Sequence, residues 1–122
     1  MSWARLTWFR GHGDDKVHSD DRSLLEPGVQ GRLVKLLGTE ESWQRVRLGN
    51  AEVRVHHSLL AESPSPRFDY GARVRTLPPR TFIVGEVISI IWHFKRNEAF
   101  YLLSVEGKPE SSRYWGNELG DA

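Results

Sequence analysis

The feature that most constrains this chain is a strand-forming pattern that occurs twice. The first copy opens on glycine at G-R-L-V-K-L-L (residues 31–37), and the second opens on glycine at G-E-V-I-S-I-I (residues 85–91). In each copy a polar turn, a return strand and a hairpin turning on glycine follow, and the copy ends at a short turn and a leucine. No long stretch shows helical periodicity. The pattern predicts an all-β protein made of two tandem small units.

The linker between the two units is predicted at residues 63–67, where the sequence reads S-P-S-P-R. Pro64 and Pro66 stiffen this stretch and remove two backbone donors. The first unit then spans residues 1–62, with an N-terminal strand and a polar loop before the repeat, and the second unit spans residues 68–122. A chain of 122 residues holds two units only if both are very small.

Alternation of polar and apolar residues places strands inside each unit. Residues 43–48 and 51–56 alternate, and the Gly49-Asn50 pair between them predicts a tight hairpin. The longest strand is predicted at 81–94, with its return strand at 99–106. The long strand is apolar on both faces, so it needs a second layer. We expect the other unit to supply that layer; the alternative is a partner chain.

The order of these elements resembles the plan of the Src-homology and Tudor-like barrels, in which short hairpins lead to one helical turn and a closing strand. The segment V-R-V-H-H-S-L-L-A-E (residues 53–62) carries the resemblance in the first unit, and R-Y-W-G-N-E-L (residues 113–119) carries it in the second. The second unit is also similar to small bacterial domains found in toxin–immunity gene neighbourhoods. The resemblance implies two five-stranded barrels packed together and a binding function, and it identifies no catalytic residue.

Aromatic side chains gather in the second unit and indicate a protein-binding surface. Phe100 and Tyr101 are neighbours in a strand, so they point to opposite faces, and the same holds for Tyr114 and Trp115. One ring of each pair can fill the core while the other meets solvent or a partner. The competing interpretation is that most of these rings are core residues, because rings in small units replace missing aliphatic side chains.

Rings and arginines are the residues that most often carry interface energy. We therefore expect another protein as the partner, and the resemblance favours an immunity-type or inhibitor role. The predicted contact residues are Trp92, Phe94, Tyr101, Tyr114, Trp115, Arg96 and Arg113.

Arginines on the predicted strands support an alternative, a nucleic-acid-binding module that grips phosphates. The residues concerned are Arg45, Arg47, Arg73 and Arg75. The formal net charge of +1 argues against a strong polyanion binder. The simpler interpretation of these arginines is a solvated face paired with glutamates across the strands.

No catalytic set, metal site or cofactor is predicted, so we do not expect an enzyme. Ser58 lies beside His57, but no third group completes a triad. One loop is rich in histidine and aspartate, yet it matches no recognised ligand spacing. A metal protein or small hydrolase centred on this loop is the remaining alternative. The loop residues are His12, Asp14, Asp15, His18, Asp20 and Asp21.

The sequence favours a soluble, cytoplasmic protein that does not enter a membrane. Its start has no apolar stretch of signal-peptide length. The longest apolar run, F-I-V-G-E-V-I-S-I-I-W, is interrupted by Glu86 and is too short to span a bilayer. Cysteine is absent, which suits a reducing compartment.

Overall fold

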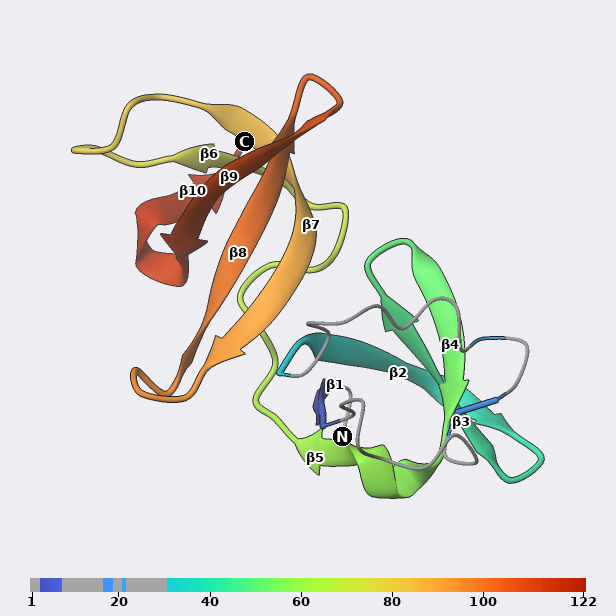
Figure 1. The fold of residues 1–122 in the computed structure, drawn as a ribbon. Helices are drawn as coiled ribbons and strands as arrows, with labels where there is room; N and C mark the ends of the chain where they lie inside the picture. Colours follow the sequence, from blue (N-terminus) through green and yellow to red (C-terminus); the bar gives the residue numbers. More distant parts are fainter. Residues whose placement is uncertain (1–2, 8–16, 19–20, 22–30) are drawn as a thin grey trace. The chain divides into compact units, whose positions relative to one another are not determined.

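The protein is all-β in the computed structural model, which describes residues 3–7, 17–18, 21 and 31–122. Its strands form two five-stranded antiparallel sheets (Figure 1), and the described residues contain short 3₁₀ turns but no α-helix. The chain divides into two compact units, Met1–Ser65 and Pro66–Ala122. The division falls inside the linker expected at 63–67. No helix in the described part of the chain has the length and apolar character to cross a bilayer.

The first unit holds strands β1 to β5 in the order β4-β3-β2-β1-β5. A 3₁₀ turn, His57–Leu59, leads directly into the last strand. The strands are β1 (Trp3–Leu6), β2 (Leu33–Glu40), β3 (Trp43–Leu48), β4 (Ala51–Val55) and β5 (Leu60–Glu62).

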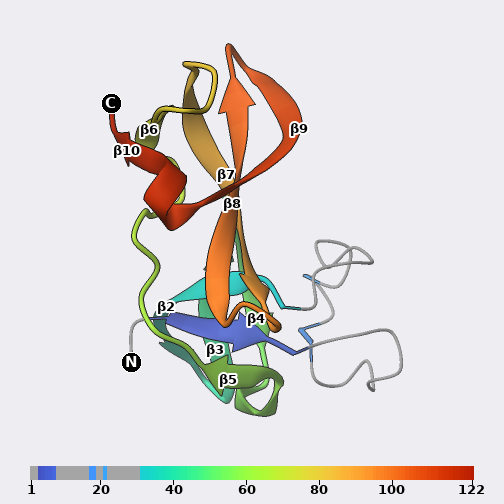
Figure 2. The ribbon, with the colours of Figure 1, turned by 90° about the vertical axis from the view of Figure 1, so that its left-hand side faces the viewer.

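The second unit holds strands β6 to β10 in the order β10-β6-β7-β8-β9. A 3₁₀ turn, Gly116–Glu118, again precedes the last strand. The strands are β6 (Arg73–Thr76), β7 (Val84–His93), β8 (Glu98–Val105), β9 (Lys108–Trp115) and β10 (Leu119–Asp121). Figure 2 shows β7, β8 and β9 as the long members of this sheet. Both units therefore share one plan, in which the last strand pairs with the first.

The two five-stranded units have the all-β class expected, and strand pairing does not close either sheet into a barrel. In each sheet the fourth and fifth strands lie at opposite edges and do not pair with each other. The last strands, β5 and β10, have three residues each and pair along one edge only, with β1 and β6.

Apolar residues at alternate strand positions fill the interior of the first unit. Val46 and Leu48 of β3 point inward, as do Val53 and Val55 of β4, which is what the alternation predicts. Leu59 of the 3₁₀ turn joins them. Burying an aliphatic side chain of this size stabilises a fold by about 1.5–3 kcal/mol, so a few such residues give this small sheet its core.

Aromatic residues take a larger part in the core of the second unit. Tyr101 and Tyr114 lie opposite each other on β8 and β9, and both are 2% exposed. Phe68 packs edge-on against Tyr101, with ring centroids 5.5 Å apart. The Tyr101 hydroxyl accepts a hydrogen bond from the backbone N–H of Arg67 at 2.9 Å. Rings thus supply volume that aliphatic residues supply in the first unit.

A register shift in β7 changes the faces expected for the longest strand. The pairing with β8 skips one residue between Val87 and Ser89, which marks a β-bulge at Ile88. Val87 and Ile90 are consequently both buried, although strict alternation places them on opposite faces. The strand also starts later than predicted, at Val84 rather than at residue 81.

The loop before β7 is tied to β6 by one threonine. The Thr76 hydroxyl donates to the carbonyl of Thr81 at 2.7 Å and accepts from the backbone N–H of Ile83 at 2.8 Å. These bonds satisfy loop backbone groups that would otherwise have paired in a longer strand, which explains the late start of β7.

Candidate functional site

One row of side chains crosses the outer face of β7, β8 and β9. Ile91 lies opposite Phe100, and Phe100 lies opposite Trp115, so all three project from the same side of the sheet. Each is half-buried. The next row, Ile90, Tyr101 and Tyr114, is buried on the other side. Successive side chains in these strands therefore point alternately to the core and to the outer face.

We call this outer surface the ring face. It comprises the cross-strand row, the histidine that ends β7 and two nearby arginines. Its residues are Ile91, His93, Phe100, Trp115, Arg96 and Arg113.

Three rings of the ring face contact one another edge to face. The centroid distances are 5.4 Å for His93–Trp115, 5.7 Å for Phe100–Trp115 and 6.3 Å for His93–Phe100. The interplanar angles lie between 65° and 75°. Edge-to-face pairs contribute about 0.5–1.5 kcal/mol each beyond buried area. The three rings therefore fix one another in position at the surface.

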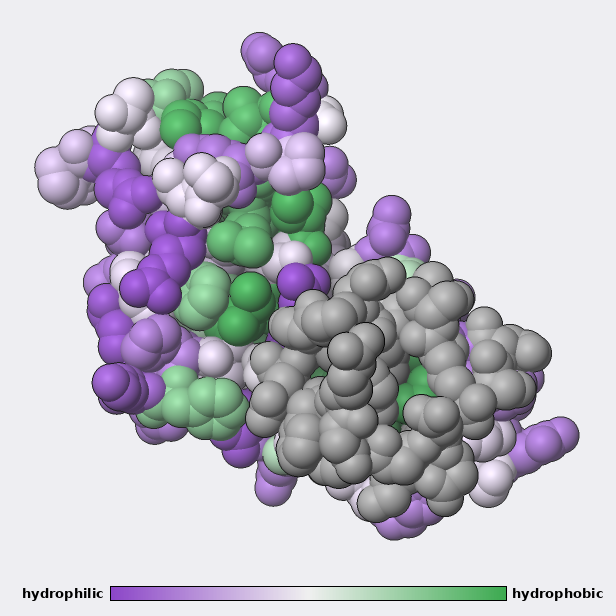
Figure 3. Space-filling view, in the orientation of Figure 1, coloured by the Kyte–Doolittle hydropathy of each residue, from purple (hydrophilic) through white to green (hydrophobic). Residues whose placement is uncertain are grey.

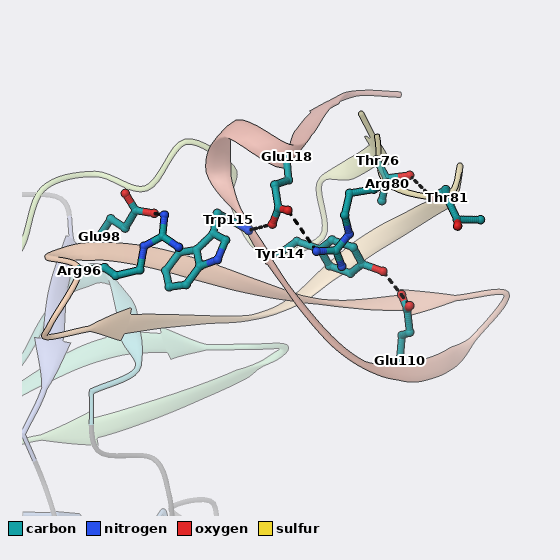
Figure 4. Close-up of polar contacts among 9 residues, drawn as sticks. All are labelled: Thr76, Arg80, Thr81, Arg96, Glu98, Glu110, Tyr114, Trp115 and Glu118. Carbon is teal, nitrogen blue, oxygen red and sulfur yellow. Dashed lines mark hydrogen bonds and ion pairs between the residues drawn. The ribbon is translucent and has the colours of Figure 1, made fainter. Parts of the chain in front are cut away.

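Arg96 covers one side of this cluster. Its guanidinium carbon lies 3.7 Å from the Trp115 ring centroid, and its Nη2 lies 3.1 Å from Glu98 Oε1 (Figure 4). Its backbone N–H donates to Nδ1 of His93 at 3.1 Å. The turn between β7 and β8 thus holds both the guanidinium and the imidazole against the tryptophan.

Arg113 carries the second positive charge of the ring face. Its guanidinium carbon lies 5.3 Å from the Phe100 centroid and 5.6 Å from the Trp115 centroid. Among the described residues no carboxylate forms an ion pair with Arg113, and the residue is exposed. It is therefore positioned by the rings while its charge remains available to a ligand.

A chain of polar contacts continues from Trp115 along the sheet (Figure 4). The Trp115 backbone N–H donates to Glu118 Oε1 at 2.9 Å, and Glu118 Oε2 lies 3.1 Å from Arg80 Nη1. Arg80 stacks on the Tyr114 ring at 4.3 Å, and the Tyr114 hydroxyl donates to Glu110 Oε1 at 2.7 Å. Burial, followed by the Glu110 hydrogen bond, raises the pKa of Tyr114. This phenol stays neutral and structural.

Some predicted contact residues lie on the ring face and others do not. Trp115, Arg96 and Arg113 belong to it. The structure places Tyr101 and Tyr114 in the core instead, because their neighbours Phe100 and Trp115 take the outer positions. That division of each pair is what strand geometry predicts.

Two other predicted contact residues are not part of the ring face. Trp92 lies opposite Ala99, on the other side of β7, and is half-buried. Phe94 follows β7 and is 64% exposed. Apolar side chains reach the surface of the second unit at several points (green in Figure 3), and Phe82 is 70% exposed. The ring-face residues absent from the predicted set are Ile91, His93 and Phe100; cross-strand register, and not the sequence, brings them together.

The arginines of the nucleic-acid alternative belong to two different sheets. Arg47 lies opposite Glu52, and Arg73 lies opposite Glu86. Arg75 donates from Nε to the carbonyl of Asp121 at 3.1 Å. The register therefore places two of these four arginines across from a glutamate. Arg45 of β3 lies opposite Arg54.

The histidines near the first unit's 3₁₀ turn have a structural explanation. His56, not His57, contacts Ser58: its Nδ1 lies 2.8 Å from the serine Oγ and accepts from the serine N–H at 3.2 Å. This arrangement caps an exposed turn.

Most of the loop rich in histidine and aspartate lies outside the described residues; His18 and Asp21 are described. Asp21 binds Arg54 through the side-chain Nε at 2.9 Å and the backbone N at 2.8 Å. The His18 ring packs edge-on against Trp43, with centroids 5.3 Å apart. The described part of the chain holds no group of three or more His, Cys, Asp and Glu residues arranged to bind a metal.

Comparison with known proteins places the chain in a family. No curated protein and no solved structure matches it. One family model matches residues 1–120, and its description is "Family of unknown function (DUF6960)". Because the match covers almost all of its length, the chain belongs to this family of unknown function, DUF6960.

Proposed function

We propose that this protein is a non-enzymatic protein-binding module and that the ring face of its second unit is the contact surface. The observation that supports this most is a set of three mutually packed rings, flanked by two arginines, on the outer side of a sheet. Aromatic and arginine side chains are enriched where protein interfaces gain most of their energy.

The fixed geometry of these side chains favours recognition. Binding normally costs free energy because side chains lose rotamers at the interface. Here ring–ring contacts restrain His93, Phe100 and Trp115, and stacking restrains Arg96. A ligand would therefore meet a surface that has already lost much of this freedom.

A narrower form of the proposal follows from the resemblance to Tudor-like barrels and to small bacterial immunity-type domains. In this form the protein is a cytoplasmic bacterial inhibitor that covers a partner's functional site. The shared strand order of the two units supports the Tudor-like comparison, since the last strand pairs with the first in both. A surface with fixed rings and an available guanidinium suits such a covering role.

A capture experiment with matched variants tests the proposal. Wild-type protein, Trp115→Ala and Arg113→Ala would serve as baits in native lysate, and retained proteins would be identified by mass spectrometry. Phe82→Ala is the control, because it removes a more exposed ring outside the ring face. We expect a specific partner to be retained by wild type and Phe82→Ala and lost from the other two.

Circular dichroism and thermal melting would verify that each variant is folded. A partner retained equally by all four proteins would refute the ring-face assignment. A parallel titration with single-stranded and duplex oligonucleotides checks the nucleic-acid alternative. Binding that falls steeply with salt and disappears in Arg45→Ala or Arg47→Ala would favour that alternative.

A further inference from the structure

The fourth strand of each sheet, β4 or β9, lies at an edge. An edge strand has a row of N–H and C=O groups that face away from its neighbour and can pair with another chain. Since the two units share one strand order, their fourth-strand edges can be compared directly.

The edge of β4 is covered by residues of its own unit. Val17 forms an antiparallel bridge with Val55, and the His18 N–H donates to the Arg54 carbonyl at 3.0 Å. Asp21 accepts from the Arg54 backbone N–H at 2.8 Å. The outward backbone groups at the end of this strand are therefore satisfied.

The edge of β9 differs. The Trp115 N–H donates to Glu118 Oε1, so it points away from β8. Trp115, Tyr114 and Arg113 follow β8 without a register shift, and outward groups recur at every second residue of an antiparallel pair. The N–H and C=O of Arg113 therefore also point outward. Within the described residues no backbone group bonds to them.

Charge indicates what this edge would bind. Lys108 and Arg113 are exposed on β9, and Arg96 lies beside Trp115. The nearby carboxylates are engaged, because Glu110 accepts from Tyr114 and Glu98 pairs with Arg96. In the second half of β9, residues 111–115, Arg113 is the one charged side chain, and no carboxylate of the described residues pairs with it, so this half of the edge complements acidic side chains. Lys108 and Pro109 also hinder pairing at the start of the strand, leaving its second half open.

We infer that β9 is a strand-addition site for an extended, acidic segment of a partner protein. The segment would pair with the outward backbone groups of Arg113 and place its carboxylates near Arg113 and Arg96. Backbone hydrogen bonds would provide affinity, and the ring face would select alternate side chains. This inference rests on the proposed function and specifies how the partner is held.

The test uses the whole chain and a defined probe, an end-blocked peptide of alternating glutamate and valine as long as the eight-residue β9. Amide NMR spectra would be recorded during titration. We expect the largest shifts at residues 110–115, and the Arg113 amide should exchange with solvent at least about tenfold more slowly when the peptide is bound. A lysine–valine peptide should bind at least about tenfold more weakly.

Changes to the peptide backbone and at Arg113 separate strand addition from other contacts. A glutamate–valine peptide N-methylated at alternate residues keeps its side chains but loses the donors that strand pairing needs, so it should bind at least about tenfold more weakly. Arg113→Pro removes both the outward N–H and the charge, whereas Arg113→Gln removes the charge alone, so Arg113→Pro should weaken binding more than Arg113→Gln does. Arg47→Gln, which removes an exposed charge from the first unit, is the control and should leave binding unchanged.

The outcomes distinguish the inference from the proposed function. Equal binding of the N-methylated peptide would overturn strand addition, and so would an absence of shifts at residues 110–115. In either case loss of the captured partner from Trp115→Ala would still support the ring face. Weak binding of both the N-methylated and lysine peptides, with normal binding to Arg47→Gln, would support the inference.

Discussion

The two sheets follow the same strand order but present different outer surfaces. Across β2, β3 and β4 one row reads Lys35, Arg47 and Glu52, which are charged residues. Across β7, β8 and β9 a row reads Ile91, Phe100 and Trp115. A charged row is typical of a face that is exposed to water. Solubility does not require a row of large apolar side chains at the surface. The comparison shows that one strand plan supports two surface chemistries, so the surface must be considered separately from the fold.

The largest expected effect tests whether the ring face is separate from the core. Tyr101→Ala should reduce the free energy of unfolding by about 3–5 kcal/mol, because it empties a fully buried site. Phe100→Ala, at the next residue, should cost less than about 2 kcal/mol, since its ring is only half-buried. Chemical denaturation of both variants measures the difference. If the two variants lost the same free energy of unfolding, the outer row would be a part of the core. The contrast between the two sheets would then disappear.

A second prediction transfers the chemistry of the first sheet to the second. Phe100→Arg combined with Trp115→Glu reproduces the opposed arginine and glutamate of β3 and β4. The ring contacts are lost, so the free energy of unfolding should fall by about 2 kcal/mol, and the captured partner should be lost. Denaturation and capture measure the two effects. Retention of the partner by this folded double variant would contradict the ring-face proposal.

The third prediction concerns the covered edge of β4 and depends on pH. Arg54, chiefly through its side-chain hydrogen bonds, holds the pKa of Asp21 below its ordinary value. This stabilisation is present above the unfolded-state pKa of about 3.9 and is lost as the pH falls through the lower folded-state value. Asp21→Asn should therefore cost about 1–2 kcal/mol at pH 7 and much less at low pH.

Denaturation of wild type and Asp21→Asn across this pH range measures the effect. The difference in the free energy of unfolding between the two proteins should grow as the pH rises from acid to neutral. The same difference at low and neutral pH would show that the carboxylate charge does not anchor the edge of β4.

The smallest expected effects come from exposed charges of the two units. Arg96 and Glu98 have side chains 48% and 44% exposed. Glu98→Gln and Glu52→Gln should each change the free energy of unfolding by less than about 1 kcal/mol, and moderate salt should reduce the difference. Thermal melting at low and high salt measures both. A clearly larger loss for Glu98→Gln would show that Arg96 needs its carboxylate to stay on Trp115.

Sequence patterns were sufficient for the strand class and for much of the inward and outward assignment. Alternation placed Val46 and Val53 inside, and it required Tyr101 and Phe100 to face opposite ways. It did not say which of the two rings was buried. That choice depends on register with β7 and β9, where Tyr101 lies between Ile90 and Tyr114.

The features that alternation missed depend on geometry between strands. The bulge at Ile88 reverses the faces of β7, and a two-residue period cannot reveal it. The pairing of whole strands, and not the alternation within them, shows that the sheets are open. The ring face depends on the turn that brings His93 and Arg96 over Trp115. Most of these contacts join residues that are distant in sequence, so residue type alone could not identify them.

Glu118 has a consequence for how far an added chain could extend. One carboxylate oxygen holds the amide of Trp115, and the other holds Arg80 in the loop after β6. The Glu118 side chain therefore ends the row of unpaired outward backbone groups at the end of β9. Replacing Glu118 with alanine would release the Trp115 N–H and lengthen the accessible edge. A single residue beyond the end of β9 therefore limits the length of any segment that pairs with this edge.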